Sequence, residues 1–152
     1  MGAEEHNVRS AEMAREWLAQ HGYPAQRTDR VAAAVVAHML SACGQDRDSV
    51  AIEGRILYDA DKIARASGLP LLASLVHLGQ QVSWEDLSYG QLAAAVNKGR
   101  QVTEEAFHSL YTAQARELAE PGYRRTLEFC DQILKLAERS AVWESDRISG
   151  LA

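Results

Sequence analysis

The sequence has 152 residues, 47% of them hydrophobic, and its net charge is −5 at neutral pH. This length is enough for one domain with a sizeable core, and no change in composition marks a second domain. The 16 lysines and arginines are scattered, so no basic surface for nucleic acid or for an anionic membrane is expected. No apolar run approaches the roughly 20 residues that span a bilayer. We therefore expect a single domain over residues 1–152, with no nucleic-acid or membrane partner.

The start of the chain has neither the basic nor the apolar segment of a secretory signal. The two cysteines, Cys43 and Cys130, lie far apart in the sequence and form neither a CxxC pair nor a disulfide framework. These features predict a cytoplasmic protein whose cysteines are reduced.

Helical periodicity describes the first part of the chain. A helix is predicted over residues 7–21, with Met13 and Trp17 on its apolar side, and a second helix is predicted over 26–40. His38 lies on the apolar face of the second helix. A histidine on such a face more often hydrogen-bonds to core neighbours than binds a ligand.

His6 heads the stripe of Trp17 if the first helix extends back to it. A ligand role and a merely frayed position stay equally open for this residue.

After a polar loop over 41–48, a helix is predicted over 50–67. At 100° per residue, one stripe about 60° wide on this helix consists of Ile52, Ile56, Asp59 and Ile63. A carboxylate on an apolar stripe costs several kcal/mol unless it is paired, protonated or bound to a metal. Two roles therefore stay open for Asp59, either as a ligand or catalytic group or as a hydrogen-bonded structural group.

The second half of the chain also has helical patterns and no strand alternation. The almost wholly apolar run at 69–78 predicts a buried helix. Further helices are predicted over 83–98, over 103–120 and from Pro121 onward, and residues 140–152 are expected to form a loosely ordered tail. The sequence thus predicts an all-α, single-domain bundle of six or seven helices.

Residues 53–63 read Glu-Gly-Arg-Ile-Leu-Tyr-Asp-Ala-Asp-Lys-Ile. With residues 6–14 and 31–38 ahead of it, this segment resembles the HD-domain superfamily of metal-dependent phosphohydrolases. In that family the late aspartate closes a metal site, and by its place in the motif Asp59 is the matching residue. His6 and His38 match positions where members with two metals have further histidine ligands. The resemblance implies an HD-like fold and a divalent metal (Mn, Mg, Zn or Fe) at Asp59, His38 and His6.

The chain departs from the family pattern in its metal ligands. The family's early histidine and its adjacent His-Asp pair should precede His6, and this sequence contains no His-Asp dipeptide. We therefore expect a truncated or degenerate HD-type phosphohydrolase that acts poorly or not at all by itself on a phosphate ester or nucleotide, with its metal retained or lost. A non-catalytic helical module for dimerisation or for binding a small ligand is the alternative.

A fold without the family's leading helices would leave apolar surface uncovered around Met13, Trp17 and residues 69–78. We therefore expect a homodimer or a separately encoded partner. Asp59 is expected to be buried and within about 10 Å of His38. Without metal, the burial of an unpaired carboxylate predicts that Asp59→Asn is neutral or mildly stabilising.

Overall fold

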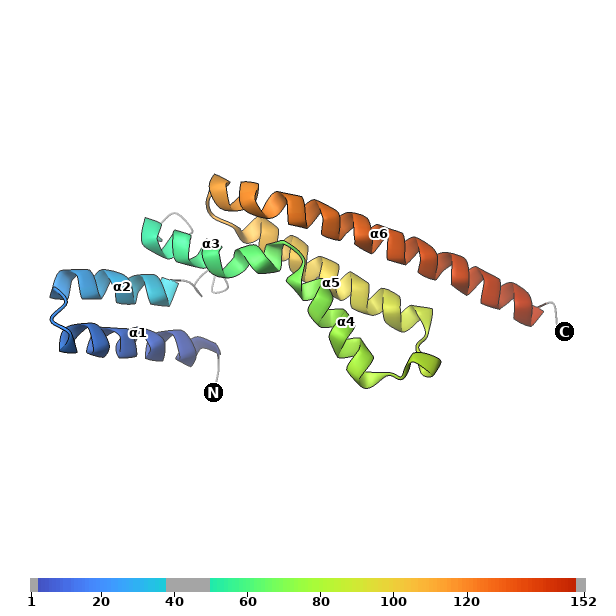
Figure 1. Cartoon of the computed structure of the whole chain (residues 1–152), viewed down its shortest axis with the longest axis horizontal. Coiled ribbons are helices and arrows are strands. Elements are labelled where there is room, and N and C mark those ends of the chain that lie inside the picture. Colours follow the sequence, from blue (N-terminus) through green and yellow to red (C-terminus); the bar gives the residue numbers. More distant parts are fainter. Residues whose placement is uncertain (1–2, 38–49, 150–152) are drawn as a thin grey trace. The chain divides into compact units, whose positions relative to one another are not determined.

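The computed structural model describes residues 3–37 and 50–149, with side chains described within 6–37, 50–83 and 85–139. These residues form an all-α bundle with six α-helices, one 3₁₀ turn at Trp84–Asp86 and no strand, which confirms the predicted fold class (Figure 1). The helices are α1 (Ala3–Gln20), α2 (Ala25–Ala37), α3 (Ile52–Ala66), α4 (Leu69–Gln81), α5 (Tyr89–Ser109) and α6 (Ala113–Ser149). Within the described part, none of them has the length and apolar character needed to cross a membrane.

Contacts between residues divide the chain into two compact units. The first unit contains residues 1–62 and 109–115, which include α1, α2, most of α3 and the turn that leads into α6. The second unit contains residues 63–108 and 116–152, which include α4, most of α5 and nearly all of α6.

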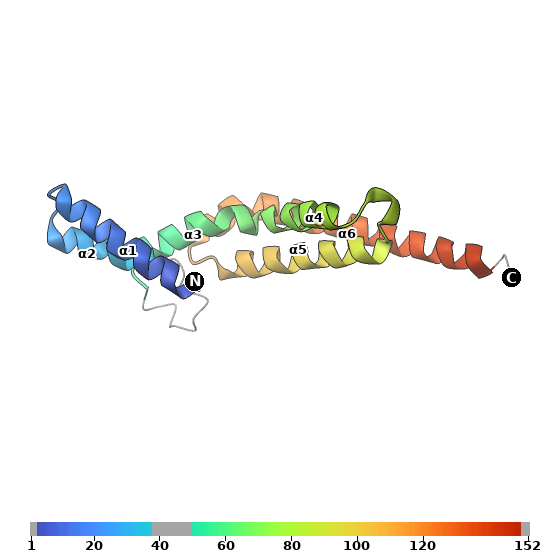
Figure 2. The same ribbon diagram turned by 90° about the horizontal axis from the view of Figure 1, so that it is seen from below.

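In the first unit α1 and α2 lie side by side as a helical hairpin (Figures 1 and 2). Gly22 makes the turn between them, with a positive φ of 71° that glycine adopts without steric cost. The side chain of Asn7 is buried and donates a hydrogen bond to the carbonyl oxygen of Val36 at 3.3 Å. Buried Ala11 and Ala32 leave room for close approach of the two helices.

The second unit depends on places where glycine lets two helices come together. Gly68, at φ 110°, begins α4 and leaves no room for a side chain next to Thr126 of α6. A Cβ on Gly99 of α5 would lie 2.5 Å from the Cα of Leu71 in α4. The core of this unit consists of Leu71, Val96 and Cys130, with Leu75, Leu92, Ile133 and Leu134 packed against it. Glycine contacts thus set how closely α4 packs on its neighbours.

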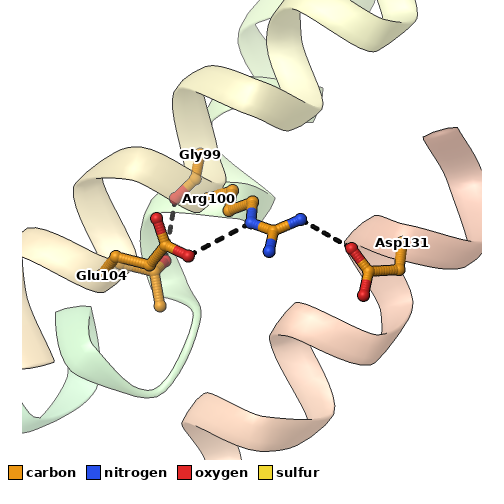
Figure 3. A network of polar contacts seen from close by, with 5 residues as sticks. Gly99, Arg100, Glu104 and Asp131 are labelled. Atoms are coloured by element: carbon orange, nitrogen blue, oxygen red, sulfur yellow. Dashed lines mark hydrogen bonds and ion pairs between the residues drawn. The ribbon is translucent and has the colours of Figure 1, made fainter.

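A charged cluster joins α5 to α6 in this unit (Figure 3). The guanidinium of Arg100 donates one hydrogen bond to Glu104, at 3.2 Å, and another to Asp131 of α6, at 2.6 Å. Hydrogen bonds to Glu104 and Asp131 raise the pKa of Arg100 above its usual range. Because all three side chains are partly solvated, this cluster adds only modestly to stability.

The helix boundaries in the second half differ from the predicted ones. The predicted helices over 83–98 and 103–120 are replaced by α5, which continues through Gly99, and the break comes instead at residues 110–112. Pro121 lies inside α6 and does not begin a new helix. Gly99 lies in the gap predicted between the helices over 83–98 and 103–120, whereas in the structure its missing side chain allows contact between α5 and Leu71.

The predicted burial of the run at 69–78 is also wrong for most of its large side chains. The run is helical, as predicted, but Leu69, Leu72 and Val76 are exposed and only Leu71 is fully buried. On α3, Ile52 and Ile56 are exposed as well, so the isoleucine stripe does not mark a core face.

Replacing Gly99 by alanine should destabilise the protein by about 1–2 kcal/mol, because the new Cβ would press on the backbone of Leu71. This loss is net of the gain that alanine normally gives inside a helix. The matched control is Gly79→Ala in α4, where a Cβ meets nothing within 4 Å and a gain of about 0.5–1 kcal/mol is expected. Urea unfolding followed by circular dichroism measures both changes. Equal stabilisation by the two substitutions would show that the contact with Leu71 is unimportant.

Candidate functional site

Asp59 is the centre of the candidate site, and its side chain is held by hydrogen bonds in the first unit. The residue is only 3% exposed. Its Oδ1 accepts a hydrogen bond from the backbone N–H of Tyr111 at 2.7 Å. Its Oδ2 accepts one from the backbone N–H of Thr112 at 2.8 Å and one from the Thr112 hydroxyl at 2.7 Å. These three hydrogen bonds offset the free-energy cost of burying the carboxylate.

The donors come from the short turn between α5 and α6. Thr112 directly precedes α6, and its Oγ1 accepts a hydrogen bond from the backbone N–H of Ala115 at 3.2 Å, which is the pattern of a helix N-cap. The same hydroxyl donates its proton to Asp59, so the cap and the carboxylate form one connected network. Asp59 therefore fixes, from α3, the point at which α6 begins.

Aromatic rings and cations surround this network. The buried Tyr58 donates its hydroxyl proton to Ser109 Oγ at 2.8 Å, and its ring meets the Tyr111 ring edge to face at 5.1 Å. The Lys62 ammonium lies 5.3 Å from the centroid of the Tyr58 ring, and the Arg55 guanidinium lies 5.9 Å from that of Tyr111. Both separations are within the range of a cation–π contact. The ring contacts and cation–π contacts thus hold the turn in place together with the hydrogen bonds to Asp59.

The described residues do not supply the donor set of the predicted metal site. A carboxylate has about four acceptor positions, and hydrogen bonds occupy three of them in Asp59. His6 is exposed on α1 and shares a hydrogen bond with Ser10 at 3.2 Å. His38 lies outside the described residues. Within the described part of the chain, no three His, Cys, Asp or Glu side chains converge as metal ligands would.

Among the described residues of the second unit, Cys130, Tyr123, His77 and His108 do not form an alternative centre. Burial raises the pKa of the Cys130 thiol, which lies in the core and is therefore a poor nucleophile. Burial, reinforced by Glu104, likewise raises the pKa of the Tyr123 phenol. His77 and His108 are exposed, and His77 shares a hydrogen bond with Gln81.

The partners of Asp59 were not predicted from the sequence. Tyr111 and Thr112 both fall inside the helix predicted over 103–120, where no turn was expected. A threonine three residues ahead of Ala115 is a weak sign of a helix start, because the glutamate or glutamine of a capping box is missing there. Asp59 and the turn are far apart in the sequence, so no local sequence pattern connects them.

Asp59→Asn should lower the free energy of unfolding by about 2–3 kcal/mol, because the amide would present a donor to groups that are themselves donors. This network reverses the sign expected for an unpaired carboxylate. The matched control is Asp61→Asn on the same helix, where the carboxylate is half exposed and pairs with the neighbouring Lys62, so the effect should be about 0.5 kcal/mol. Chemical unfolding gives both values, and amide hydrogen exchange at Tyr111 and Thr112 should accelerate only in the first variant. A neutral Asp59→Asn would contradict the proposed structural role.

Comparison of this chain with protein-family models, with curated proteins and with solved structures found no match. The resemblance to the HD-domain superfamily therefore depends on the quoted segments alone. The structure shows the all-α class and the hydrogen bonds of Asp59, and neither of these tests membership of that superfamily. The site geometry is the firmer basis for a proposal about function.

Proposed function

We propose that this chain is a non-catalytic helical module, a degenerate relative of the HD-type phosphohydrolases, that acts by associating with a second copy of itself. One observation carries the first half of the proposal, namely that both oxygens of Asp59 accept hydrogen bonds from Tyr111 and Thr112. The residue that the motif assigns to metal chemistry is committed to positioning a helix. It has one acceptor position left, so at most one further bond, to a metal or to another donor, is open to it.

Exposed apolar side chains support the second half of the proposal. In the first unit, Met13 and Trp17 lie one turn apart on α1 and are 61% and 59% exposed. In the second unit, Leu72 and Val76 lie one turn apart on α4 and are 60% and 62% exposed, and Leu69 extends the same stripe. Continuous apolar stripes of this kind mark surfaces that bind protein. A second copy is the proposed occupant because both faces are available on every chain.

The activity of the isolated chain is the first test. With Mn²⁺ or Zn²⁺ added, hydrolysis of p-nitrophenyl phosphate should not exceed that of a blank with metal alone. The reason is that the described residues bring no set of ligands together around Asp59. A metal-dependent turnover of about 1 per second would contradict the proposal if His38→Ala abolished it while the helical content stayed unchanged. That result would support the phosphohydrolase hypothesis.

The oligomeric state is the second test. Sedimentation velocity at micromolar concentration should give a dimer, and an obligate helical interface typically buries more than about 2,000 Å² in total. The double variant Leu72→Glu with Val76→Glu should weaken the dimer at least about tenfold, because each new charge must be desolvated.

The matched control for that test is His77→Glu, which adds a charge to the same helix about 100° around from the stripe. It should leave the dimer intact. A wild-type chain that sediments as a monomer, or equal effects of the control and the double variant, would contradict self-association through α4.

A further inference from the structure

In the first unit, α2 and α3 border a groove with a volume of about 600 Å³. Its apolar lining includes Val31 and Ala34 from α2 and Leu57 from α3. Its charged lining consists of Arg27, Arg30 and Glu53. The volume is within the range of roughly 300–1,000 Å³ that is usual for small-molecule sites. The groove is separate from the hydrogen bonds of Asp59.

The groove follows from the spacing of residues on two helices. Arg27, Val31 and Ala34 share one face of α2 at intervals of four and three residues, and Glu53 and Leu57 lie one turn apart on α3. Near the other end of α2 the helices touch, because a Cβ on Gly54 would lie 2.8 Å from the Cβ of Ala37. Side chains from two packed helices, rather than from a loop, therefore line the groove.

The charges on the groove leave it with an excess of one positive charge. Arg30 pairs with Glu53, and the pKa of Glu53 is lowered by a hydrogen bond from its own backbone N–H and by the hydrogen bond from Arg30. Glu53 is therefore ionised at neutral pH. Within the described residues, the guanidinium of Arg27 makes no ion pair or hydrogen bond. A guanidinium next to apolar lining matches an anionic group attached to an apolar body.

We infer that the groove between α2 and α3 binds a small amphipathic oxyanion, an apolar chain or ring that ends in a carboxylate or a phosphate. The anionic group lies against Arg27, and the apolar body covers Val31 and Leu57. This inference does not depend on the proposed self-association, since the stripes on α1 and α4 do not line the groove. It makes one of the expected alternatives, a helical module that binds a small ligand, more specific, because it names the class of ligand.

Titration of the full ¹⁵N-labelled chain with octanoate, octyl phosphate and octan-1-ol tests the inference. The resulting shifts of backbone amide signals give both affinity and location. Octanoate, octyl phosphate or both should shift signals of α2 and α3 and bind at least about tenfold more tightly than the neutral alcohol. Whichever anion binds more tightly identifies the head group, and added salt should weaken the anions alone.

Two substitutions should act in opposite directions. Arg27→Gln should weaken the anion about tenfold and leave octan-1-ol within twofold, because it removes the guanidinium and keeps the lining. Glu53→Gln should tighten the anion severalfold, because it releases Arg30 from its ion pair. The matched control, Arg9→Gln, removes a positive charge from an exposed position of α1 outside the groove and should change neither affinity.

Equal binding of octanoate, octyl phosphate and octan-1-ol would overturn the inference, and so would an unchanged anion affinity in Arg27→Gln. Shifts confined to α4 and α6 would show only adhesion to exposed apolar side chains and would also overturn it. If no probe binds and Val31→Asp changes the sedimentation coefficient of the chain, the groove belongs to a protein interface instead. That last result would leave the proposed non-catalytic function intact, so the two proposals fail separately.

Discussion

The buried carboxylate of Asp59 is the interaction on which the first unit depends. Between α5 and α6 the chain changes direction over three residues, and the backbone N–H groups of Tyr111 and Thr112 have no helical acceptor there. Asp59 reaches them from α3, more than fifty residues earlier in the sequence. Burial of the charge is tolerated because three donors surround it, and the same hydrogen bonds hold the turn in place.

The interior of both units is built largely from small side chains. Among the described residues, most of the fully buried hydrophobic positions are alanines, including Ala11, Ala32, Ala66, Ala119 and Ala137. Together with the glycine contacts, these alanines let helix backbones approach closely. The consequence is that larger side chains such as Trp17 and Phe129 stay outside. The large apolar side chains that remain exposed in this way are the basis for the proposed self-association.

Sequence patterns predicted the parts of the structure that depend on local periodicity. The first four helices were placed within a few residues, and the burial of Asp59 was expected from its stripe. The break at 110–112 was not predicted, because it depends on hydrogen bonds to Asp59 from a distant segment. The continuation of α5 through Gly99 was not predicted for a related reason, since the role of Gly99 is a contact with Leu71 of another helix. Sequence patterns report the local preference of a residue, whereas the break at 110–112 and the conformation at Gly99 depend on contacts with Asp59 and Leu71, which are distant in the sequence.

The same limit applies to the reading of Asp59 as a metal ligand. The isoleucine stripe and the family motif both selected this residue, but neither shows what the carboxylate contacts, and Ile52 and Ile56 of that stripe are themselves exposed. A metal and a set of backbone amides satisfy a buried carboxylate equally well, so burial alone does not distinguish them. The donors distinguish them, and here they are Tyr111 and Thr112. Because Asp59 stabilises the fold, the groups that remain available for binding are Arg27 in its groove and the apolar stripes on α1 and α4.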